Sequence, residues 1–73
     1  MLDKLTDIIR EYMDDNSIEV TENTILIADL GLSSFDLVQL ASIVEDELDV
    51  EIPDRMIKTF KTVGDVISFL DKQ

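Results

Sequence analysis

The sequence contains neither cysteine nor histidine among its 73 residues. Without cysteine the chain can form no disulfide or thiolate metal site, and it has no cysteine nucleophile. Without histidine it lacks the side chain that most often acts as a general base near neutral pH. Together these absences argue against an enzyme that works with its own residues alone.

Long apolar runs and basic residues are also scarce. No run approaches the roughly 20 apolar residues needed to cross a bilayer, and no signal peptide precedes the first helical pattern. We therefore expect a cytoplasmic protein with no membrane segment. Only 6 basic residues stand against 17 acidic ones, which gives a formal net charge of −11. A field of this sign repels nucleic acids and anionic lipids, and it favours basic proteins as partners.

The length allows one domain, residues 1–73, because a chain of this size buries only about 60% of the surface that it exposes when unfolded. Apolar spacing predicts an all-α fold, a small four-helix bundle that we expect to be monomeric. Its principal helices are predicted at residues 2–13, from residue 34 to about residue 48, and from a capping box at residues 62–65 onward. Pro53 suits the first turn of a short third helix.

Residues 18–32 are rich in β-branched side chains and show no steady helical period, which predicts a long ordered loop over the core. We expect five apolar side chains to anchor this loop: Ile18, Val20, Ile25, Ile27 and Leu30. A β-hairpin turning at residues 22–24 is the alternative. The absence of an Asn-Gly or Asp-Gly pair favours the loop.

Two adjacent serines open the second predicted helix. If Ser33 is the N-cap, Asp36 falls at the third helical position and completes a capping box. If Ser34 were the cap, that position would be Leu37, which cannot accept a hydrogen bond. Ser34 is then left at the first helical position, where the backbone amides and the helix dipole favour a phosphate. An ordinary surface serine is the alternative interpretation.

A helical wheel divides this second helix into two faces. One arc is apolar and is predicted to be buried: Leu37, Leu40, Ala41, Val44 and Leu48. Phe35 and Val38 fall on the opposite, acidic side, and Ile43 lies at a border that the third helix could cover. Two exposed apolar residues among carboxylates predict a docking surface with an apolar centre and a charged rim.

The stretch "DLGLSSFDLVQL", residues 29–40, resembles the phosphopantetheine attachment motif of acyl carrier proteins, Asp-Leu-Gly-x-Asp-Ser-Leu. The segment "VEDELDVEIPDRMIKTFKTVGDVISFL", residues 44–70, resembles the second half of that family. This resemblance implies that Ser34 carries a 4′-phosphopantetheine arm derived from coenzyme A and added by a phosphopantetheinyl transferase. Acyl groups would be bound to the arm as thioesters and delivered to enzymes of fatty acid or polyketide-type biosynthesis. The arm brings its own thiol, which suits a chain without cysteine.

The resemblance also implies a partner face. Carried over position by position, it contains six residues: Phe35, Asp36, Val38, Gln39, Glu45 and Asp46. The implied partners are the transferase and acyl-activating, acyltransferase or ketosynthase-type enzymes with basic docking patches. No metal ligand is implied in the chain itself, and magnesium would be held by the transferase.

Three positions depart from the family pattern. Ser33 stands where aspartate is usual, Phe35 replaces the common leucine, and Gln39 stands where an acid is frequent. These changes leave room for a specialised pathway. The family also shelters acyl chains among its helices, which implicates the core residues Ile43 and Met56 together with Ile67.

Two other functions fit the sequence. A carrier of aminoacyl, D-alanyl or peptidyl groups would use the same arm, although the Gly-Gly pair common before the serine of peptidyl carriers is absent. From another class, an acidic helical interaction domain would bind partners with Ser34 unmodified. A calcium loop at residues 14–20 is disfavoured because Glu19 stands where an EF-hand needs glycine.

Overall fold

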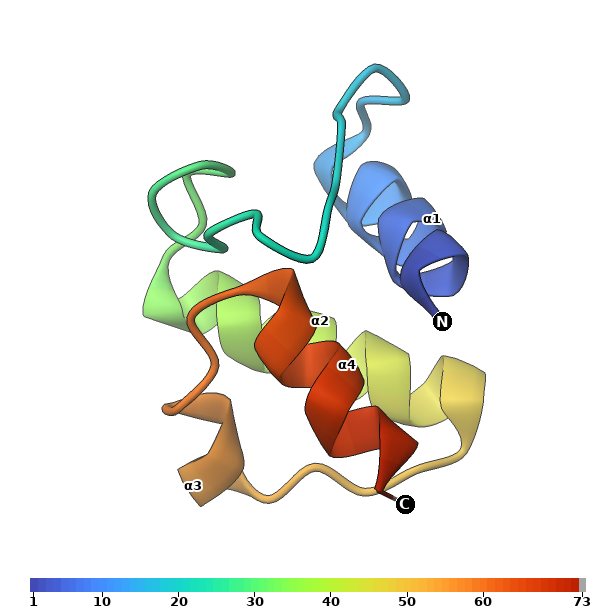
Figure 1. The fold of residues 1–73 in the computed structure, drawn as a ribbon, viewed down its shortest axis with the longest axis vertical. Helices are drawn as coiled ribbons and strands as arrows, with labels where there is room; N and C mark the ends of the chain where they lie inside the picture. Colours follow the sequence, from blue (N-terminus) through green and yellow to red (C-terminus); the bar gives the residue numbers. More distant parts are fainter. Residues whose placement is uncertain (73) are drawn as a thin grey trace.

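The computed structural model describes residues 1–72, and the described chain folds into four helices (Figure 1). They are α1 (Leu2–Met13), α2 (Ser34–Leu48), α3 (Asp54–Ile57) and α4 (Val63–Asp71). The prediction of three principal helices and a short one is confirmed. The capping box that opens α4 is also confirmed, because the Thr62 side chain accepts from Asp65 N and the Asp65 carboxylate accepts from Thr62 N. Pro53 was predicted in the first turn of the third helix. In the structure it precedes α3 as the N-cap.

The helices enclose one apolar core. α1 packs against α2 and α4, and α2 also contacts α3. The buried cluster draws on every helix: Leu5, Ile8, Ile9, Leu40, Ala41, Val44, Ile57, Val63, Ile67 and Leu70. The predicted buried arc of α2 is confirmed at Leu40, Ala41 and Val44, while Leu37 and Leu48 are half-buried against the same cluster.

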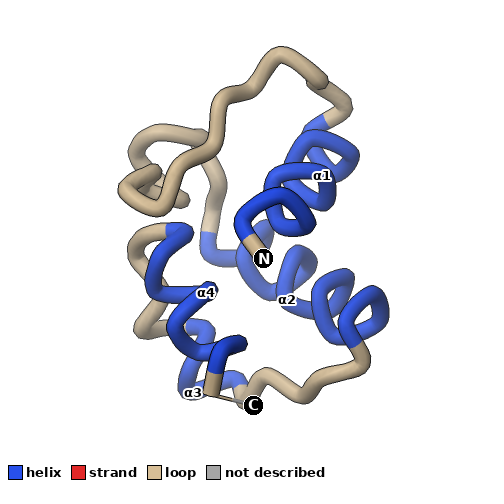
Figure 2. Tube along the Cα trace, turned by 45° about the vertical axis from the view of Figure 1, so that its right-hand side comes forward, coloured by secondary structure: helices blue, strands red, loops and turns tan. Residues whose placement is uncertain are grey.

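The connection between α1 and α2 is an ordered loop, as predicted, and it arches over one end of the helices (Figure 2). The alternative hairpin is not formed, since the described residues show only an isolated bridge between Ile25 and Thr62. Three backbone hydrogen bonds attach the loop to the start of α4. Leu26 N donates to Lys61 O at 2.9 Å, Val63 N donates to Thr24 O at 3.0 Å, and Gly64 N donates to Glu22 O at 2.8 Å.

The anchors of this loop differ from the prediction. Val20 is buried and Ile18 and Leu30 are half-buried, as expected, but Ile25 and Ile27 are 43% and 51% exposed. Leu26 and Leu32 take their place in the core. Leu26 N is bonded to Lys61 O, and the chain turns directly after Ile25, with Asp29 N bonded to Ile25 O and Gly31 N bonded to Ile27 O. This local fold buries Leu26 and leaves its two isoleucine neighbours exposed.

Candidate functional site

The two serines at the start of α2 have separate roles in the structure. Ser33 is the N-cap, and its backbone is extended, with φ −94° and ψ 172°. Its hydroxyl accepts a hydrogen bond from Asp36 N at 3.2 Å, and Asp36 Oδ2 accepts one from Ser33 N at 2.8 Å. The predicted capping box is therefore confirmed. It satisfies two amides that a helix start leaves without intrahelical partners.

Asp36 also joins this helix start to α1. The Tyr12 hydroxyl donates to Asp36 Oδ1 at 2.7 Å. Hydrogen bonds from the Ser33 backbone, from Tyr12 and from the Ser33 hydroxyl lower the pKa of Asp36, because all of them stabilise the carboxylate. The same contact raises the pKa of Tyr12, since its proton is held by the carboxylate. Sequence analysis missed this link, because helical spacing placed Tyr12 on the core stripe without showing where its hydroxyl would point.

Ser34 is exposed at the first position of α2. Its hydroxyl makes no hydrogen bond within the described part of the chain, whereas the neighbouring Ser33 hydroxyl is occupied by the cap. A phosphate attached there would lie at the positive end of a 15-residue helix, where backbone amides and the helix dipole stabilise negative charge. The position suits the nucleophile of a modification reaction and the phosphodiester that it would produce.

The predicted partner residues divide into exposed and engaged side chains. Phe35 and Val38 are 68% and 47% exposed, which confirms their predicted outward position. Gln39 and Asp46 are exposed as well. Glu45 is half-buried, and its carboxylate accepts a hydrogen bond from Ile52 N at 2.8 Å. Glu45 and Asp36 therefore also stabilise the fold, while the other four residues are exposed.

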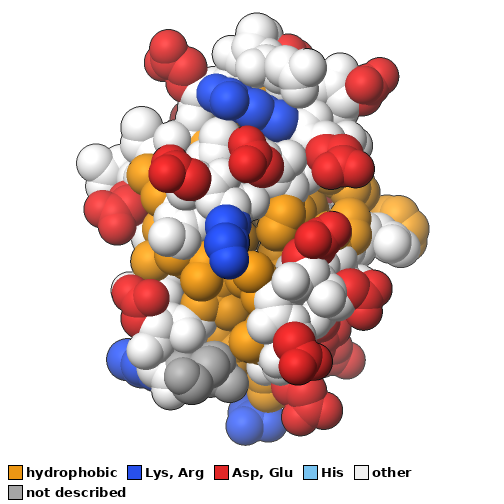
Figure 3. Space-filling model, turned by 90° about the vertical axis from the view of Figure 1, so that its right-hand side faces the viewer, with side chains coloured by type: hydrophobic (Ala, Val, Ile, Leu, Met, Phe, Trp, Pro, Cys, Tyr) orange, Lys and Arg blue, Asp and Glu red, His pale blue; other side chains and the backbone are white. Residues whose placement is uncertain are grey.

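Acidic side chains outnumber basic ones on the face of the molecule shown in Figure 3. Figure 3 shows a face on which aspartates and glutamates surround an apolar area, with few basic groups between them. Among the described residues no group of three or more acidic, histidine or cysteine side chains is arranged to hold a metal ion. Within that same part of the chain no helix is both long and apolar enough to cross a membrane.

The structure contains an apolar cavity in the core and an open groove beside Ser34. A cavity of about 50 Å³ lies in the core among Leu40, Val44, Phe60 and their neighbours. An open groove of about 850 Å³ includes Ser34 itself in its lining. Ile43, Met56 and Ile67, the residues implied to shelter an acyl chain, line neither space.

A family model for the phosphopantetheine attachment site matches residues 3–70. The chain belongs to this family. The prosthetic group of the family is covalently attached 4′-phosphopantetheine. The carriers of the family hold acyl groups as thioesters on this phosphopantetheine arm. The exposed Ser34 hydroxyl at a helix start, with neither cysteine nor histidine in the chain, fits a carrier of this family whose thiol comes from the arm.

Known acyl carrier proteins are similar to this carrier over nearly its whole length. The acyl carrier protein of Clostridium perfringens strain 13 is 44% identical over 70 residues, which is 96% of this chain and 92% of that protein. That of Phenylobacterium zucineum is 37% identical over 73 residues, covering 100% and 92% of the two chains. A solved structure from Mycobacterium tuberculosis, assigned as an acyl carrier protein, is 33% identical and superposes with a TM-score of 0.88 over 96% of this chain and 93% of that chain.

Proposed function

We propose that Ser34 carries the 4′-phosphopantetheine arm of this acyl carrier. The observation that supports this assignment is the difference between the two serines. The Ser33 hydroxyl is engaged in the capping box, while the Ser34 hydroxyl is exposed at the first helical position. Only the second can be esterified without removing the cap.

Attachment requires a separate transferase. The Ser34 oxygen attacks the coenzyme A phosphate that bears the pantetheine, a new phosphorus–oxygen bond forms, and adenosine 3′,5′-bisphosphate leaves. The serine proton passes to a base of the transferase, and magnesium held by that enzyme and the substrate phosphates stabilises the developing charge. The carrier presents the hydroxyl and supplies no catalytic group of its own.

The partner face surrounds the attachment point. We propose that Phe35 and Val38 form its apolar centre, and that Asp46 and the outer edge of Glu45 attract basic patches on partner enzymes. Gln39 adds a neutral polar contact, and Asp36 contributes charge while keeping its place in the cap. Exposed charge pairs bring partners together quickly and are screened by salt, so docking is fast and reversible. A carrier that visits several enzymes requires such release.

The proposed setting is cytoplasmic fatty acid or polyketide-type biosynthesis, with residues 1–73 acting as a single, monomeric domain. Its partners are the transferase and the acyl-activating, acyltransferase or ketosynthase-type enzymes. The acidic surface argues against nucleic acid and anionic membranes as partners. The carrier catalyses no step of the pathway.

Intact mass spectrometry tests the attachment site. Incubation with coenzyme A and a broad-specificity transferase should add one phosphopantetheine to the native chain and none to Ser34→Ala. Ser33→Ala is the matched control, and it should still accept the arm even though loss of the cap costs about 1 kcal/mol of folding free energy. Modification of Ser34→Ala, or no modification of the native chain, would contradict the proposal.

A further inference from the structure

The first turn of α2 carries Ser34, and the start of a helix tends to fray because its first amides have no intrahelical acceptors. The capping box between Ser33 and Asp36 closes this turn with hydrogen bonds inside residues 33–37. Such local bonds keep the turn helical wherever it lies. They do not fix its place relative to the rest of the molecule.

One side-chain hydrogen bond reaches this turn from another element. Among the side-chain bonds within residues 1–72, only the Tyr12 hydroxyl does so, donating to Asp36 Oδ1 at 2.7 Å across 24 positions of sequence. The other carboxylate oxygen, Oδ2, accepts from Ser33 N at 2.8 Å and from Ser33 Oγ at 3.0 Å. The same carboxylate therefore completes the cap and connects it to α1.

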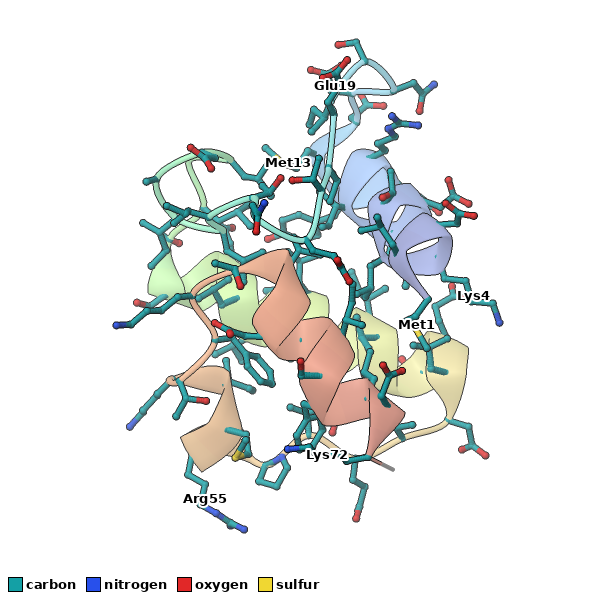
Figure 4. The ribbon with its side chains drawn as sticks, viewed as in Figure 1. Met1, Lys4, Met13, Glu19, Arg55 and Lys72 are labelled. Atoms are coloured by element: carbon teal, nitrogen blue, oxygen red, sulfur yellow. The ribbon has the colours of Figure 1, made fainter. Side chains whose placement is uncertain are left out.

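The hydroxyl of Tyr12 is held in place by the packing of its ring. Tyr12 is half-buried one residue before the end of α1, and it packs against the core cluster. In Figure 4 the last residue of α1, Met13, lies beside the loop, whereas Lys4 projects from the other end of the helix. Because close packing restricts the ring, the hydroxyl is a donor in a fixed position.

The donor is also uncharged, which matters at this position. Asp36 is the one acidic residue in the first turn of α2, since Ser33 stands where the family usually has aspartate. A lysine or arginine would orient the carboxylate but would also cancel its charge. The tyrosine orients the carboxylate and leaves its charge for the helix dipole and for a basic partner.

We propose that Tyr12 is a positioning residue for phosphopantetheine transfer. Acting through Asp36, it holds the first turn of α2 at one place on the molecule and presents the Ser34 hydroxyl to the transferase in a constant orientation. The inference rests on the proposed function, because Ser34 is the acceptor. Transfer needs the serine oxygen close to the phosphorus of coenzyme A and in line with its leaving group, and small displacements of a reacting group slow such a step strongly.

Single-turnover transfer with the transferase in excess tests this role. Intact mass gives the rate as a function of transferase concentration. Tyr12→Phe keeps the ring and removes only the hydroxyl. It should lower the maximum rate about three- to tenfold, while the half-saturating concentration stays within about twofold of the native value because the docking residues are unchanged.

Arg10→Lys is the matched control on the same helix. It removes the guanidinium that donates to Ile18 O at 2.8 Å and keeps the charge. That bond attaches α1 to the loop and does not involve the first turn of α2. Both the maximum rate and the half-saturating concentration should therefore stay at the native values. Circular dichroism at the assay temperature confirms that the variants are folded.

Two further measurements separate positioning from stability. Amide hydrogen exchange, measured on the chain without an arm, should be faster at Asp36 and Leu37 in Tyr12→Phe than in the native chain or in Arg10→Lys. In an Asp36→Ala background, Tyr12→Phe should cause no further loss of maximum rate or protection, because the residue through which it acts is gone.

Each remaining outcome contradicts a particular step. A native maximum rate in Tyr12→Phe overturns the inference while the attachment to Ser34 stands. A change confined to the half-saturating concentration would place Tyr12 in the docking surface, and equal losses in Tyr12→Phe and Arg10→Lys would make stability the cause. Either result overturns the positioning role. If the native chain takes no arm, the proposed function fails and the inference fails with it.

Discussion

At the scale of single residues, neighbours of the same type have different roles according to their backbone position. Ser33 and Ser34 carry the same hydroxyl, but the extended backbone of Ser33 points its oxygen at Asp36 N, while Ser34 already belongs to the helix. Ile25 and Leu26 are both apolar, yet only Leu26 is buried. One step along the chain thus decides whether a side chain is engaged in the fold or exposed to a partner.

Gly64 is required by the close approach of the loop to α4. A Cβ at this position would lie 2.9 Å from the Glu22 carbonyl oxygen, which also accepts the Gly64 N–H at 2.8 Å. We predict that Gly64→Ala lowers the free energy of unfolding by about 1 to 3 kcal/mol, although alanine has the better helix propensity. Urea denaturation measures the change. Ser68→Ala, at an exposed position of the same helix, should stay within about 0.5 kcal/mol of the native value.

Asp65 makes stability depend on pH in the acid range. Hydrogen bonds from Lys61 N and Thr62 N lower its pKa in the folded state. Because the pKa of Asp65 is lower in the folded than in the unfolded chain, its carboxylate stabilises the fold at any pH above the ordinary carboxyl pKa of about 4. This stabilisation is lost as the pH falls through the pKa of the folded state. We therefore predict that Asp65→Asn is less stable than the native chain at pH 6 and that the gap narrows towards pH 3.

Urea denaturation at several pH values measures this gap. Asp7→Asn, at an exposed position in the middle of α1, controls for the loss of one negative charge. A gap of constant size across the range would contradict the role assigned to the Asp65 carboxylate.

At the scale of elements, α2 contributes both to the core and to the proposed partner face. Its inner arc is buried, its outer side exposes Phe35 and Val38, and its first turn carries both serines. Tyr12 fixes that first turn to α1 through Asp36. Ser34, the proposed attachment point, is therefore held by the same contacts that hold the helix.

The C-terminal end of α2 is electrostatically unfavourable. Asp49 caps it in the left-handed conformation, with φ 54°, and places a negative charge at the negative end of the helix dipole. Asparagine tolerates this conformation equally well. We predict that Asp49→Asn raises the free energy of unfolding by about 0.3 to 1 kcal/mol, measured by urea denaturation. Asp3→Asn removes the same charge from the first turn of α1, where no gain is expected, so a gain of equal size there would point to net charge alone.

At the scale of the whole molecule, stability must overcome the repulsion among 17 acidic residues in a fold with a radius of gyration of 11.0 Å. The run Glu45, Asp46, Glu47 and Asp49 concentrates part of that charge. We predict a melting temperature that rises with sodium chloride and with magnesium, because both screen or neutralise the carboxylates. Thermal unfolding followed by circular dichroism measures it, and a melting temperature indifferent to both salts would contradict this account.

The helices and their capping boxes could be predicted because their signals are local. Apolar spacing within α1 and α2, the Ser33–Asp36 pair and the Thr62–Asp65 pair each depend on residues fewer than five positions apart, and a helix brings such residues together wherever it lies. The outward position of Phe35 followed from the same periodicity. Charge and the absence of cysteine and histidine argued against whole classes of function without any structure.

The loop and the groove could not be predicted, because they depend on contacts between distant parts of the chain. In "TILI", residues 24–27, three adjacent residues are apolar, so the pattern alone could not say which side faces inward. That choice is made by hydrogen bonds to Lys61 and Val63, more than thirty residues away. The sequence by itself therefore determined the helices, the caps and the serine beside them, while tertiary packing decided that Leu26 is buried and that Ile25 and Ile27 line the same groove as Lys58 and Lys61.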